Sequence, residues 1–504
     1  MAKYLLIGAV GGPNFGDEVI LASWIKRIRE FDSCSVIICD GYNSDNVAKF
    51  VDGDVYTLKP DESLWACTYS AVSEHVNDSS NSWDEIQASF YDPNRAWKVI
   101  NCVEAVKRHN IDQIHIIGGG YLNELWPANY IILLLARIIA WQSGARIIAT
   151  GLGLIPTKQD DVSGLVGILS TFDSVDVRDV ESYDLLKRLA PGQISFSGDD
   201  ALLFVNNGRV DYPLQILDAP ALVICLQNDL FPGDAAAAGL FSTSAMELLK
   251  SYGINNIIYA AAMAADVREP SEALRCQLES NGFCVSLLDP KQLTEDGFPV
   301  SIGGLTITSR YHPHLLAALS GFRGVALSAT GYYDTKHQAV RNMGSKWPVL
   351  HKDDIYENIH EVMEGELKKQ ATTFNKVVRG SFVKKKQEQA RAALMRLEKP
   401  TALPFDFIDI WSKNLHSLAL SDEKNAGLLA QLQESQASYN NQIETNSGLA
   451  SQLTVVQSQL DAALLNIAQI SENLEQEKAE KNLIVNSRVW RMTAPLRWVF
   501  SRFR

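Results

Sequence analysis

Residues 3–30 read KYLLIGAVGGPNFGDEVILASWIKRIRE, and this stretch decides how the chain begins to fold. An apolar run of strand type, Tyr4–Ala9, leads into a turn rich in glycine, and a helical pattern then covers Glu18–Glu30. A glycine turn between a strand and a helix brings backbone N–H groups and the helix N-terminus to the edge of a sheet, where both favour an anion. The glycines are not spaced as GxGxxG, so the turn gives poor support to a nicotinamide cofactor.

Short apolar runs continue to alternate with helical patterns along the chain. The first series of predicted strands is Tyr4–Ala9, Val36–Cys39, Gln113–Ile117, Arg146–Thr150, Ser174–Val177 and Ile194–Phe196. A second series follows a polar link at Asn206–Asp218 and comprises Ala221–Leu226, Ile257–Ala260, Val285–Leu288, Leu305–Thr308 and Val325–Leu327. Further helices are predicted at Ala128–Gln142, Val180–Leu189, Ser242–Ser251, Ser271–Asn281, His314–Leu319 and Asp353–Lys369. This alternation predicts parallel sheets that are covered by helices on both faces.

The predicted fold class is therefore α/β, with two Rossmann-like domains on either side of a cleft, followed by an α-helical coiled coil. The first domain is expected at 1–205, with a helical insertion at about 61–109, and the second at 206–380. A helical linker is expected at 381–424, the coiled coil at 425–480 and a basic tail at 481–504. Ligands of open α/β sheets bind beyond the carboxyl ends of the strands, so the site is expected there.

Composition excludes several classes of function. The 504 residues carry a formal net charge of -13, which argues against nucleic acid as a partner because phosphate binding needs a basic face. Seven cysteines without a CxxC pair are typical of reduced thiols in a cytosol, not of a disulfide framework or a metal site. We read no secretion signal. The most apolar stretch, YIILLLARIIAW at Tyr130–Trp141, is shorter than the roughly 20 residues of a spanning helix and predicts a buried core helix.

The C-terminal part shows a heptad pattern. Positions seven apart hold Leu432, Tyr439, Asn446, Leu453, Leu460, Ile467 and Leu474, and the offset positions hold Leu449, Val456, Ala463 and Ile470. Asn446 falls at a core position, where a polar residue fixes the register and favours two strands. The pattern predicts a homodimer through a coiled coil; the alternative is a single long helix that lies on the chain's own domains.

The last 18 residues, SRVWRMTAPLRWVFSRFR, hold five arginines, no acid, two tryptophans and two phenylalanines. Basic and aromatic residues on one short segment are typical of an interfacial helix on anionic lipid. The expected location is therefore cytoplasmic and peripheral, at the inner face of the plasma membrane. A solvated basic tail, or a helix that caps the coil, is the alternative.

Three glycine turns follow successive predicted strands and point to one edge of the first sheet. They are Val10–Gly16, then IIGGGYLNE with Gly118, Gly119 and Gly120, then ATGLGLIP with Gly151 and Gly153. Such turns allow close approach of the backbone by a ligand or by another segment. Asp17 and Glu18 either cap the first helix or orient a sugar hydroxyl at the cleft.

In the second half, ITSRYHPHLLAALSGF places Arg310 and His312 between a strand and a helix, so both are expected to face the cleft. Arginine holds a carboxylate or phosphate by two parallel hydrogen bonds, and histidine exchanges a proton near neutral pH. His314 is the weaker candidate because it is expected in the first turn of the helix. Arg178 ends a predicted strand and is a further candidate for binding an anion.

These segments, in this order, resemble the polysaccharide pyruvyl transferase family over roughly residues 1–370. GGPNFGDEVIL looks like the family's glycine loop, GGGYLNE like its triple-glycine turn and GLGLIP like the turn that follows. VDVRDVESYDLLKRL, SGDDALLF, SRYHPHLLAALSG and YYDTKHQAV are similar to later motifs of the family. The closing SRVWRMTAPLRW is similar to endings of bacterial surface-polysaccharide glycosyltransferases.

The resemblance implies a two-domain fold of the glycosyltransferase-B type. It also implies transfer of the enolpyruvyl group of phosphoenolpyruvate, a co-substrate, to a sugar of an exopolysaccharide, capsule or lipopolysaccharide as a cyclic ketal, without another cofactor. In the roles so implied, His312 is the acid, Asp17 or Glu18 orients or deprotonates the acceptor, and Arg310, Arg178 and Lys336 hold the donor's anionic groups. The acceptor is expected at the first glycine turns, with the binding residues Asn14, Gly16, Gly118, Gly119 and Gly120.

Two positions depart from the family pattern. Gln227 stands where the family often has arginine, and Leu152 where it commonly has glutamine. Fewer cations on the donor side leave open another donor, another acceptor or lost activity. A nucleotide-sugar glycosyltransferase of the same architecture is one alternative, although no convincing Glu-x7-Glu pair is found. A non-catalytic coiled-coil scaffold is the other, and the presence of Arg310, His312 and Lys336 argues against it.

Overall fold

The computed structural model describes residues 1–395 except 13, 44–54, 72–81, 188, 190–191, 207–208, 211–213, 232–238, 267–268 and 370–373, with isolated residues beyond. The chain divides into two compact units, Met1–Asp406 and Phe407–Arg504, and everything below concerns the first. The expected coiled coil at 425–480 lies outside the described residues except for isolated positions, and the expected tail at 481–504 lies wholly outside them.

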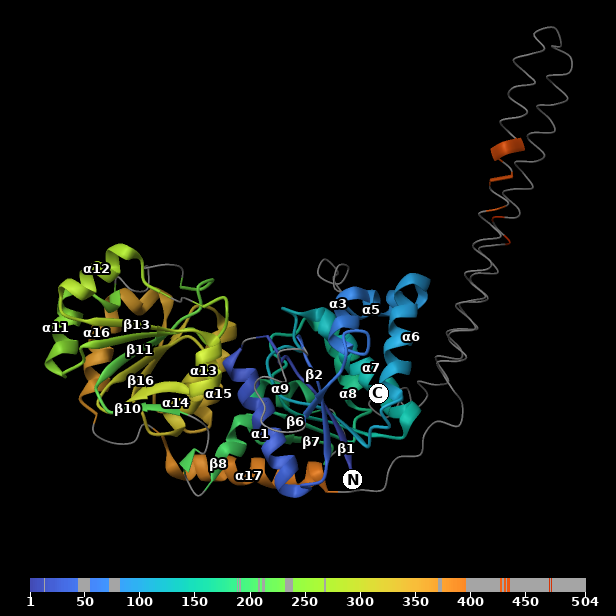
Figure 1. The fold of residues 1–504 in the computed structure, drawn as a ribbon, viewed down its shortest axis with the longest axis horizontal. Coiled ribbons are helices and arrows are strands. Elements are labelled where there is room, and N and C mark those ends of the chain that lie inside the picture. Colours follow the sequence, from blue (N-terminus) through green and yellow to red (C-terminus); the bar gives the residue numbers. More distant parts are fainter. Residues whose placement is uncertain are drawn as a thin grey trace, which may run out of the picture. The chain divides into compact units, whose positions relative to one another are not determined.

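The N-terminal half is built on a parallel sheet of seven strands in the order β3-β2-β1-β4-β5-β6-β7 (Figure 1). Its strands are β1 (Lys3–Ile7), β2 (Val36–Asp40), β3 (Val55–Thr57), β4 (Gln113–Ile116), β5 (Arg146–Leu152), β6 (Ser174–Val177) and β7 (Ile194–Phe196). Its helices are α1 (Phe15–Phe31), α3 (Leu64–Ala71), α5 (Ser82–Tyr91), α6 (Pro93–Lys107), α7 (Tyr130–Ser143), α8 (Val162–Leu169) and α9 (Val180–Leu186). Short 3-10 turns lie at η1 (Pro127–Asn129), η2 (Gln159–Asp161) and η3 (Asp200–Phe204).

The C-terminal half is built on a parallel sheet of six strands in the order β13-β12-β11-β15-β16-β17. Its strands are β11 (Ala221–Cys225), β12 (Asn256–Ala260), β13 (Cys284–Leu288), β15 (Leu305–Thr308), β16 (Gly324–Ser328) and β17 (Val349–His351). Small sheets pair β8 (Val205–Asn206) with β9 (Arg209–Val210) and β10 (Leu214–Leu217) with β14 (Phe298–Ser301). The helices are α11 (Thr243–Ser251), α12 (Glu272–Ser280), α13 (Pro290–Asp296), α14 (Tyr311–Leu319), α15 (Gly331–Asn342), the 3-10 turn η4 (Lys352–Asp354), α16 (Ile355–Leu367) and α17 (Lys376–Leu394).

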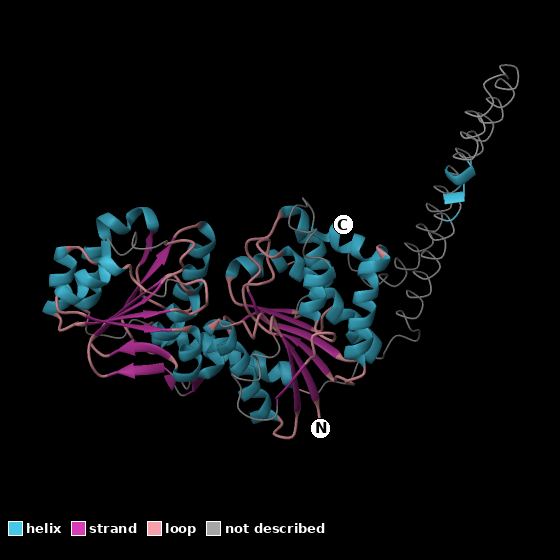
Figure 2. Cartoon of the chain, turned by 45° about the horizontal axis from the view of Figure 1, so that its top comes forward, coloured by secondary structure: helices cyan, strands magenta, loops and turns pink. Residues whose placement is uncertain are grey.

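The prediction of an α/β fold with parallel sheets is confirmed. Most central strands are buried along their whole length, because helices cover both faces of each sheet (Figure 2). Helices fill much of the predicted insertion at 61–109, as α3, α5 and α6. Several elements carry no clear sequence period and were not predicted, among them β3, α8, α13, α15 and β17.

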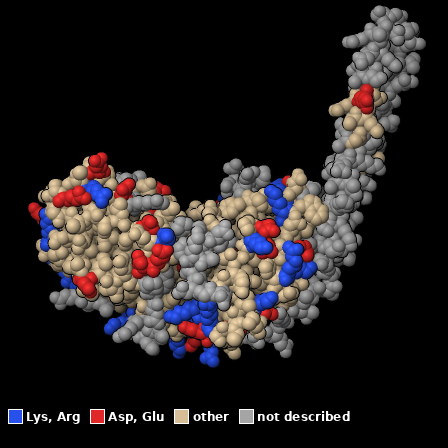
Figure 3. Space-filling view, in the orientation of Figure 1, with Lys and Arg blue, Asp and Glu red and all other residues tan. Residues whose placement is uncertain are grey.

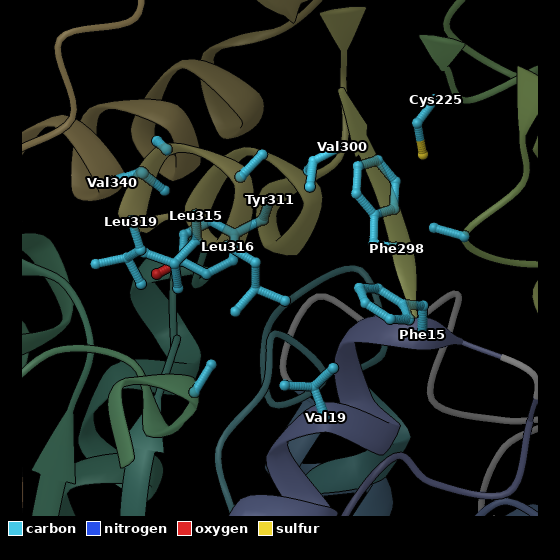
Figure 4. Close-up of a cluster of buried hydrophobic side chains, with 14 of the residues drawn as sticks. Phe15, Val19, Cys225, Phe298, Val300, Tyr311, Leu315, Leu316, Leu319 and Val340 are labelled. Atoms are coloured by element: carbon cyan, nitrogen blue, oxygen red, sulfur yellow. The ribbon is translucent and has the colours of Figure 1, made fainter. Parts of the chain in front are cut away.

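A hydrophobic cluster joins the two halves (Figure 4). Phe15 and Val19 on α1 face Phe298 on β14 and Leu315 on α14, and all four side chains are buried. The Phe15 and Phe298 rings lie 5.8 Å apart between centroids, and the Phe15 N–H donates to the Ala262 carbonyl at 2.8 Å. Burial of this apolar surface holds the N-terminus of α1 against the N-terminus of α14.

Helix α17 spans the expected domain boundary at residue 380. The helix begins at Lys376 and packs into the N-terminal half, where Ala390 and Leu394 share a buried cluster with Trp24 (Figure 1, orange). Lys386 is fully buried there, and its Nζ lies 2.6 Å from Asp176 and 2.8 Å from Asp200. Residues 381–394, which the sequence assigned to a helical linker, are helical and pack on the N-terminal half.

The surface carries charges of both signs. On the face shown in Figure 3, Lys and Arg side chains lie among Asp and Glu side chains. Within the described part of the chain, no helix has both the length and the apolar character that a membrane span requires.

Candidate functional site

A cavity of about 600 Å³ is lined by both halves of the first unit. Eight of the eleven residues predicted for the site line it: Asn14, Gly16, Asp17, Gly120, Arg178, Arg310, His312 and Lys336. They come from the carboxyl ends of strands in both sheets and from the helix starts that follow. The rule that ligands of parallel sheets bind at this edge explains why residues so far apart in sequence meet here.

The turn at the start of α1 orients one carboxylate. Asn14 has extended backbone angles and caps the helix, because its side-chain oxygen accepts from the Gly16 N–H at 3.2 Å. The side-chain amide of Asn14 donates to Asp17 at 2.5 Å. Asn14, and not Asp17 or Glu18, is thus the helix cap, which leaves Asp17 facing the cavity.

Asp17 is half-buried among charged groups. Burial raises the pKa of Asp17 to about 6, although the nearby charges of His312, Arg178 and Lys336 oppose the shift. A carboxylate with a pKa near neutrality is suited to exchange a proton with a substrate hydroxyl.

Three predicted residues do not line the cavity. Glu18 is buried behind the glycine turn, where its carboxylate accepts from the Gly11 N–H at 2.7 Å, and burial raises its pKa to about 8. The Gly118 N–H donates to Asp200 at 3.1 Å, and the Gly119 carbonyl accepts from the Gly153 N–H at 3.0 Å. A Cβ at Gly118 would lie 2.7 Å from the Gly151 carbonyl oxygen, so this glycine allows two turns to pack closely.

His312 lies in the first turn of α14, which begins at Tyr311 and not at His314 as predicted. Its Nε2 atom is 3.5 Å from Asp199, a fully buried carboxylate that follows β7. Burial alone would raise the pKa of Asp199, but the charges of His312 and Arg178 outweigh it and lower the pKa to about 2. Asp199 therefore supplies negative charge beside the imidazole at neutral pH.

Arg178 is almost fully buried at the end of β6. Its guanidinium lies 3.8 Å from Asp199 and stacks on the Tyr311 ring at 4.6 Å. A Cβ at Gly153 would lie 2.4 Å from Nε of Arg178, and one at Gly120 would lie 2.9 Å from its Nη2. The second and third glycine turns thus make room for this side chain.

Arg310 is paired within the protein. Its guanidinium donates two hydrogen bonds to Asp266, one of them at 2.9 Å. Beside it, the Gln227 side-chain amide donates to the Tyr333 hydroxyl, and the Gln227 oxygen has no hydrogen-bond partner among the described residues. The position where the family often has arginine therefore presents a neutral amide to the cavity.

Lys336 lies over the faces of two tyrosines, 4.0 Å from the centroid of Tyr332 and 5.1 Å from that of Tyr333. Burial and the charges of Arg178 and Arg310 lower the pKa of Lys336 well below its usual range. The prediction that Lys336 joins these cations is consistent with the geometry, but the crowding weakens its own charge.

His314 is a structural residue. Its ring is buried, stacks on Trp347, and hydrogen bonds to His337 at 3.1 Å and to Ser345 at 2.8 Å. Burial lowers the pKa of both histidines. Behind the cavity, this pair fixes α14 against α15.

The sequence reasoning missed two acids and a set of aromatic residues. Asp199 directly follows a strand within SGDDALLF, so its position at the sheet edge was a usable signal. Asp266 lies in a loop without a pattern. The aromatic lining, described below, comes from the irregular segment after β2, from the insertion and from the segment after β4. Among the described residues, no group of three or more acids, histidines or cysteines could hold a metal ion.

Comparison with protein families places the site in context. Residues 14–262 match the family model Polysaccharide pyruvyl transferase. Over these residues the chain is similar to the polysaccharide pyruvyl transferase family. The matched range includes the second and third glycine turns, Arg178 and Asp199, whereas Gly11, Gly12, Arg310, His312 and Lys336 lie outside it. No curated protein sequence matches the chain.

Comparison with solved structures finds similarities of low sequence identity. The chain is similar to a UDP-GlcNAc 2-epimerase from Methanocaldococcus jannaschii, with 11% identity, a TM-score of 0.47 and coverage of 78% of this chain and 100% of that one. A putative UDP-N-acetylglucosamine 2-epimerase from Listeria monocytogenes gives 11% identity, a TM-score of 0.46 and coverage of 80% of this chain and 99% of that one. UGT89C1 from Arabidopsis thaliana, complexed with UDP-L-rhamnose, gives 11% identity, a TM-score of 0.42 and coverage of 78% of this chain and 99% of that one.

Proposed function

We propose that this protein is a polysaccharide pyruvyl transferase that transfers the enolpyruvyl group of phosphoenolpyruvate to a sugar of a bacterial surface polysaccharide, as a ketal. One observation carries the proposal: a single cavity brings Asp17 and the cap of α1 together with His312, Arg178 and Lys336. The cations suit a donor that carries a phosphate and a carboxylate. We also propose that the two Rossmann-like halves form a fold of the glycosyltransferase-B type.

The reaction needs an acid and a base on opposite sides of the donor. The methylene carbon of phosphoenolpyruvate gains a proton and becomes a methyl group, and the two hydroxyl oxygens of the sugar form bonds to the adjacent carbon. The bond from that carbon to the phosphate oxygen breaks, so inorganic phosphate leaves. The proton of one sugar hydroxyl restores the proton that the acid gave to the methylene carbon. The proton of the other hydroxyl leaves with the phosphate, so the reaction is balanced.

The residues of the cavity suit these steps. His312 delivers the proton to the methylene carbon, and Asp199 supplies the negative charge that a protonated imidazole needs. Asp17 takes the proton of the sugar hydroxyl, and Asn14 holds its carboxylate in place. Arg178 and Lys336 bind the phosphate and carboxylate of the donor, with Arg310 beside them.

A nucleotide-sugar glycosyltransferase remains the second candidate. It is favoured by Gln227, whose unpartnered side-chain oxygen would accept a hydrogen bond from a hydroxyl or from a base N–H. A third possibility, a scaffold without activity, predicts that the cavity binds neither class of donor.

Thermal shift of the full chain tests the donor, because a ligand that binds only the folded state raises the melting temperature. We expect phosphoenolpyruvate to stabilise the wild type, and Lys336→Met to lose most of the shift. Lys346→Met removes an exposed lysine outside the cavity and should keep it. A shift with UDP-sugars and none with phosphoenolpyruvate would instead support the glycosyltransferase; no shift with either would support the scaffold.

We also propose that the chain forms a dimer through 425–480 and that the basic segment 481–504 contacts anionic lipid at the inner face of the plasma membrane. Light scattering measures the first, and sedimentation with phosphatidylglycerol vesicles measures the second. A monomer, or equal binding to neutral vesicles, would contradict them.

A further inference from the structure

The N-terminal half contributes a group of aromatic rings to the cavity, in addition to the charged residues described above. These rings belong to Tyr42, Trp65, Tyr69, Tyr121 and Trp126. The roles proposed above do not use them.

Four of the rings form a connected row, and Trp126 lines the same cavity. Trp65 and Tyr121 lie 5.3 Å apart between centroids, Tyr42 and Trp65 lie 6.5 Å apart, and Tyr42 and Tyr69 lie 5.5 Å apart. A Cβ at Gly12 would lie 3.3 Å from the Tyr42 ring, so the row adjoins the glycine turn at which the acceptor sugar is proposed to bind.

The rings run from the buried part of the cavity to the solvent. Trp65 and Tyr121 are 2% and 5% exposed, whereas Tyr42 and Trp126 are 60% and 46% exposed. Large aromatic side chains at the rim of a polar cavity provide flat apolar faces for a ligand that extends out of it.

Trp65 adds a polar observation. Its indole N–H is buried and has no hydrogen-bond partner among the described residues, and Trp65 is one of the residues that line the cavity. Buried donors are almost always paired, so an unpaired donor beside a ligand cavity indicates an acceptor atom on the ligand. Asn129 also lines this part of the cavity.

We infer that this aromatic row is a subsite that binds the sugars next to the reacting sugar of the acceptor. A pyranose offers a face of C–H groups to an aromatic ring and hydroxyl oxygens to N–H donors, which matches rings interspersed with polar groups. A hydrocarbon chain would leave the indole N–H of Trp65 without a partner, whereas the Asn129 amide already donates to the Tyr121 carbonyl at 2.8 Å. The inference rests on the proposed function for its reacting sugar, but the rings predict glycan binding by themselves.

Binding to a glycan array tests this without turnover. The full chain would be applied to fragments of bacterial surface glycans graded from one to six sugars. We expect binding to fragments of two or more sugars and weak binding to the matching monosaccharides. The double variant Tyr42→Ala with Trp126→Ala should weaken oligosaccharide binding at least about tenfold, which corresponds to about 1.4 kcal/mol.

The matched control is Tyr56→Ala with Trp97→Ala. These side chains are 59% and 36% exposed, and they do not line the cavity, so binding should persist. Equal binding of monosaccharides and oligosaccharides, no binding to any fragment, or equal loss in both double variants would each overturn the subsite. A phosphoenolpyruvate shift with no glycan binding would refute the subsite alone, and glycan binding without that shift would refute the pyruvyl transfer alone.

Discussion

Gly16 and His312 are in such close contact that a Cβ added to Gly16 would lie 1.9 Å from Nδ1 of His312. One residue starts the first helix of the N-terminal half and the other starts α14 of the C-terminal half. The position of the imidazole in the cavity is thus set by a glycine almost 300 residues away, and by the hydrophobic cluster that presses the two helix ends together.

Gly16→Ala should displace His312 and abolish most of the activity while the fold persists. The control is Gly365→Ala, inside α16, where an added Cβ meets nothing within 4 Å. That change should be neutral for activity and stabilise the protein by up to about 1 kcal/mol, since alanine favours helix. Phosphate release and thermal melts measure both; full activity in Gly16→Ala would contradict the contact.

His312→Gln removes the proposed acid and should lower kcat about 100-fold or more. Asp199→Asn should lower kcat as well, because the negative charge beside the imidazole is lost. His351→Gln, outside the cavity, is the control. Near wild-type turnover in His312→Gln with an unchanged melting temperature would remove this residue from the mechanism.

The titration of Asp17 should produce the acidic limb of the pH profile of kcat/KM. Because its pKa is about 6, the basic form increases as the pH rises through 6, and kcat/KM should rise with it. Asp17→Asn should cost about 100-fold or more and abolish this limb. Asp334→Asn, an exposed acid on α15, should leave the profile unchanged. If the acidic limb persists in the Asp17→Asn variant, it arises from the titration of another group.

Glu18 predicts a dependence of stability on pH. Its pKa in the folded protein is about 8, far above the value in the unfolded chain. At pH values between these two pKa values, the folded state therefore binds more protons than the unfolded state. Its stabilising contribution is complete below the unfolded value and is lost as the pH rises toward 8. Glu18→Gln keeps an acceptor for the Gly11 N–H and should melt higher than the wild type at pH 8.5, with a smaller difference at pH 5. Parallel melting curves across this range would contradict the assignment.

Lys386 predicts a large effect on stability. Lys386→Met leaves Asp176 and Asp200 buried without their cation and should cost about 3–5 kcal/mol in the free energy of unfolding. Lys384→Met on the same helix removes a side chain that is 78% exposed and should change stability by less than about 1 kcal/mol. Urea melts compare the two. If Lys386→Met does not fold, adding Asp176→Asn and Asp200→Asn should restore folding; equal small effects of the two lysine variants would refute the buried network.

Much of this arrangement was predictable from local patterns. Apolar runs and helix periods located most of the strands and helices, and the sheet-edge rule brought Arg178, Arg310 and His312 to one cleft. The sequence could not separate Asp17 from Glu18, because adjacent residues on a helix point about 100° apart and either one could have faced the ligand.

Other features depend on tertiary contacts. Asp266 meets Arg310 only after β12 and β15 are placed in the same sheet, and its loop has no period. In the sequence, Lys386 is one of three consecutive lysines at 384–386, a pattern that is typical of an exposed segment. Its burial becomes visible only in the folded structure. Tyr42 and Trp126 line one cavity only because the segments after β2 and β4 lie at the same edge of the sheet.

The ion pair of Arg310 with Asp266 has a consequence for ligand exchange. Asp266 accepts both hydrogen bonds of the Arg310 guanidinium, so a donor carboxylate or phosphate that used this cation would have to displace Asp266. Its affinity would then be the difference between two anions that compete for one cation. An anion that binds less strongly than Asp266 would leave Arg310 paired within the protein.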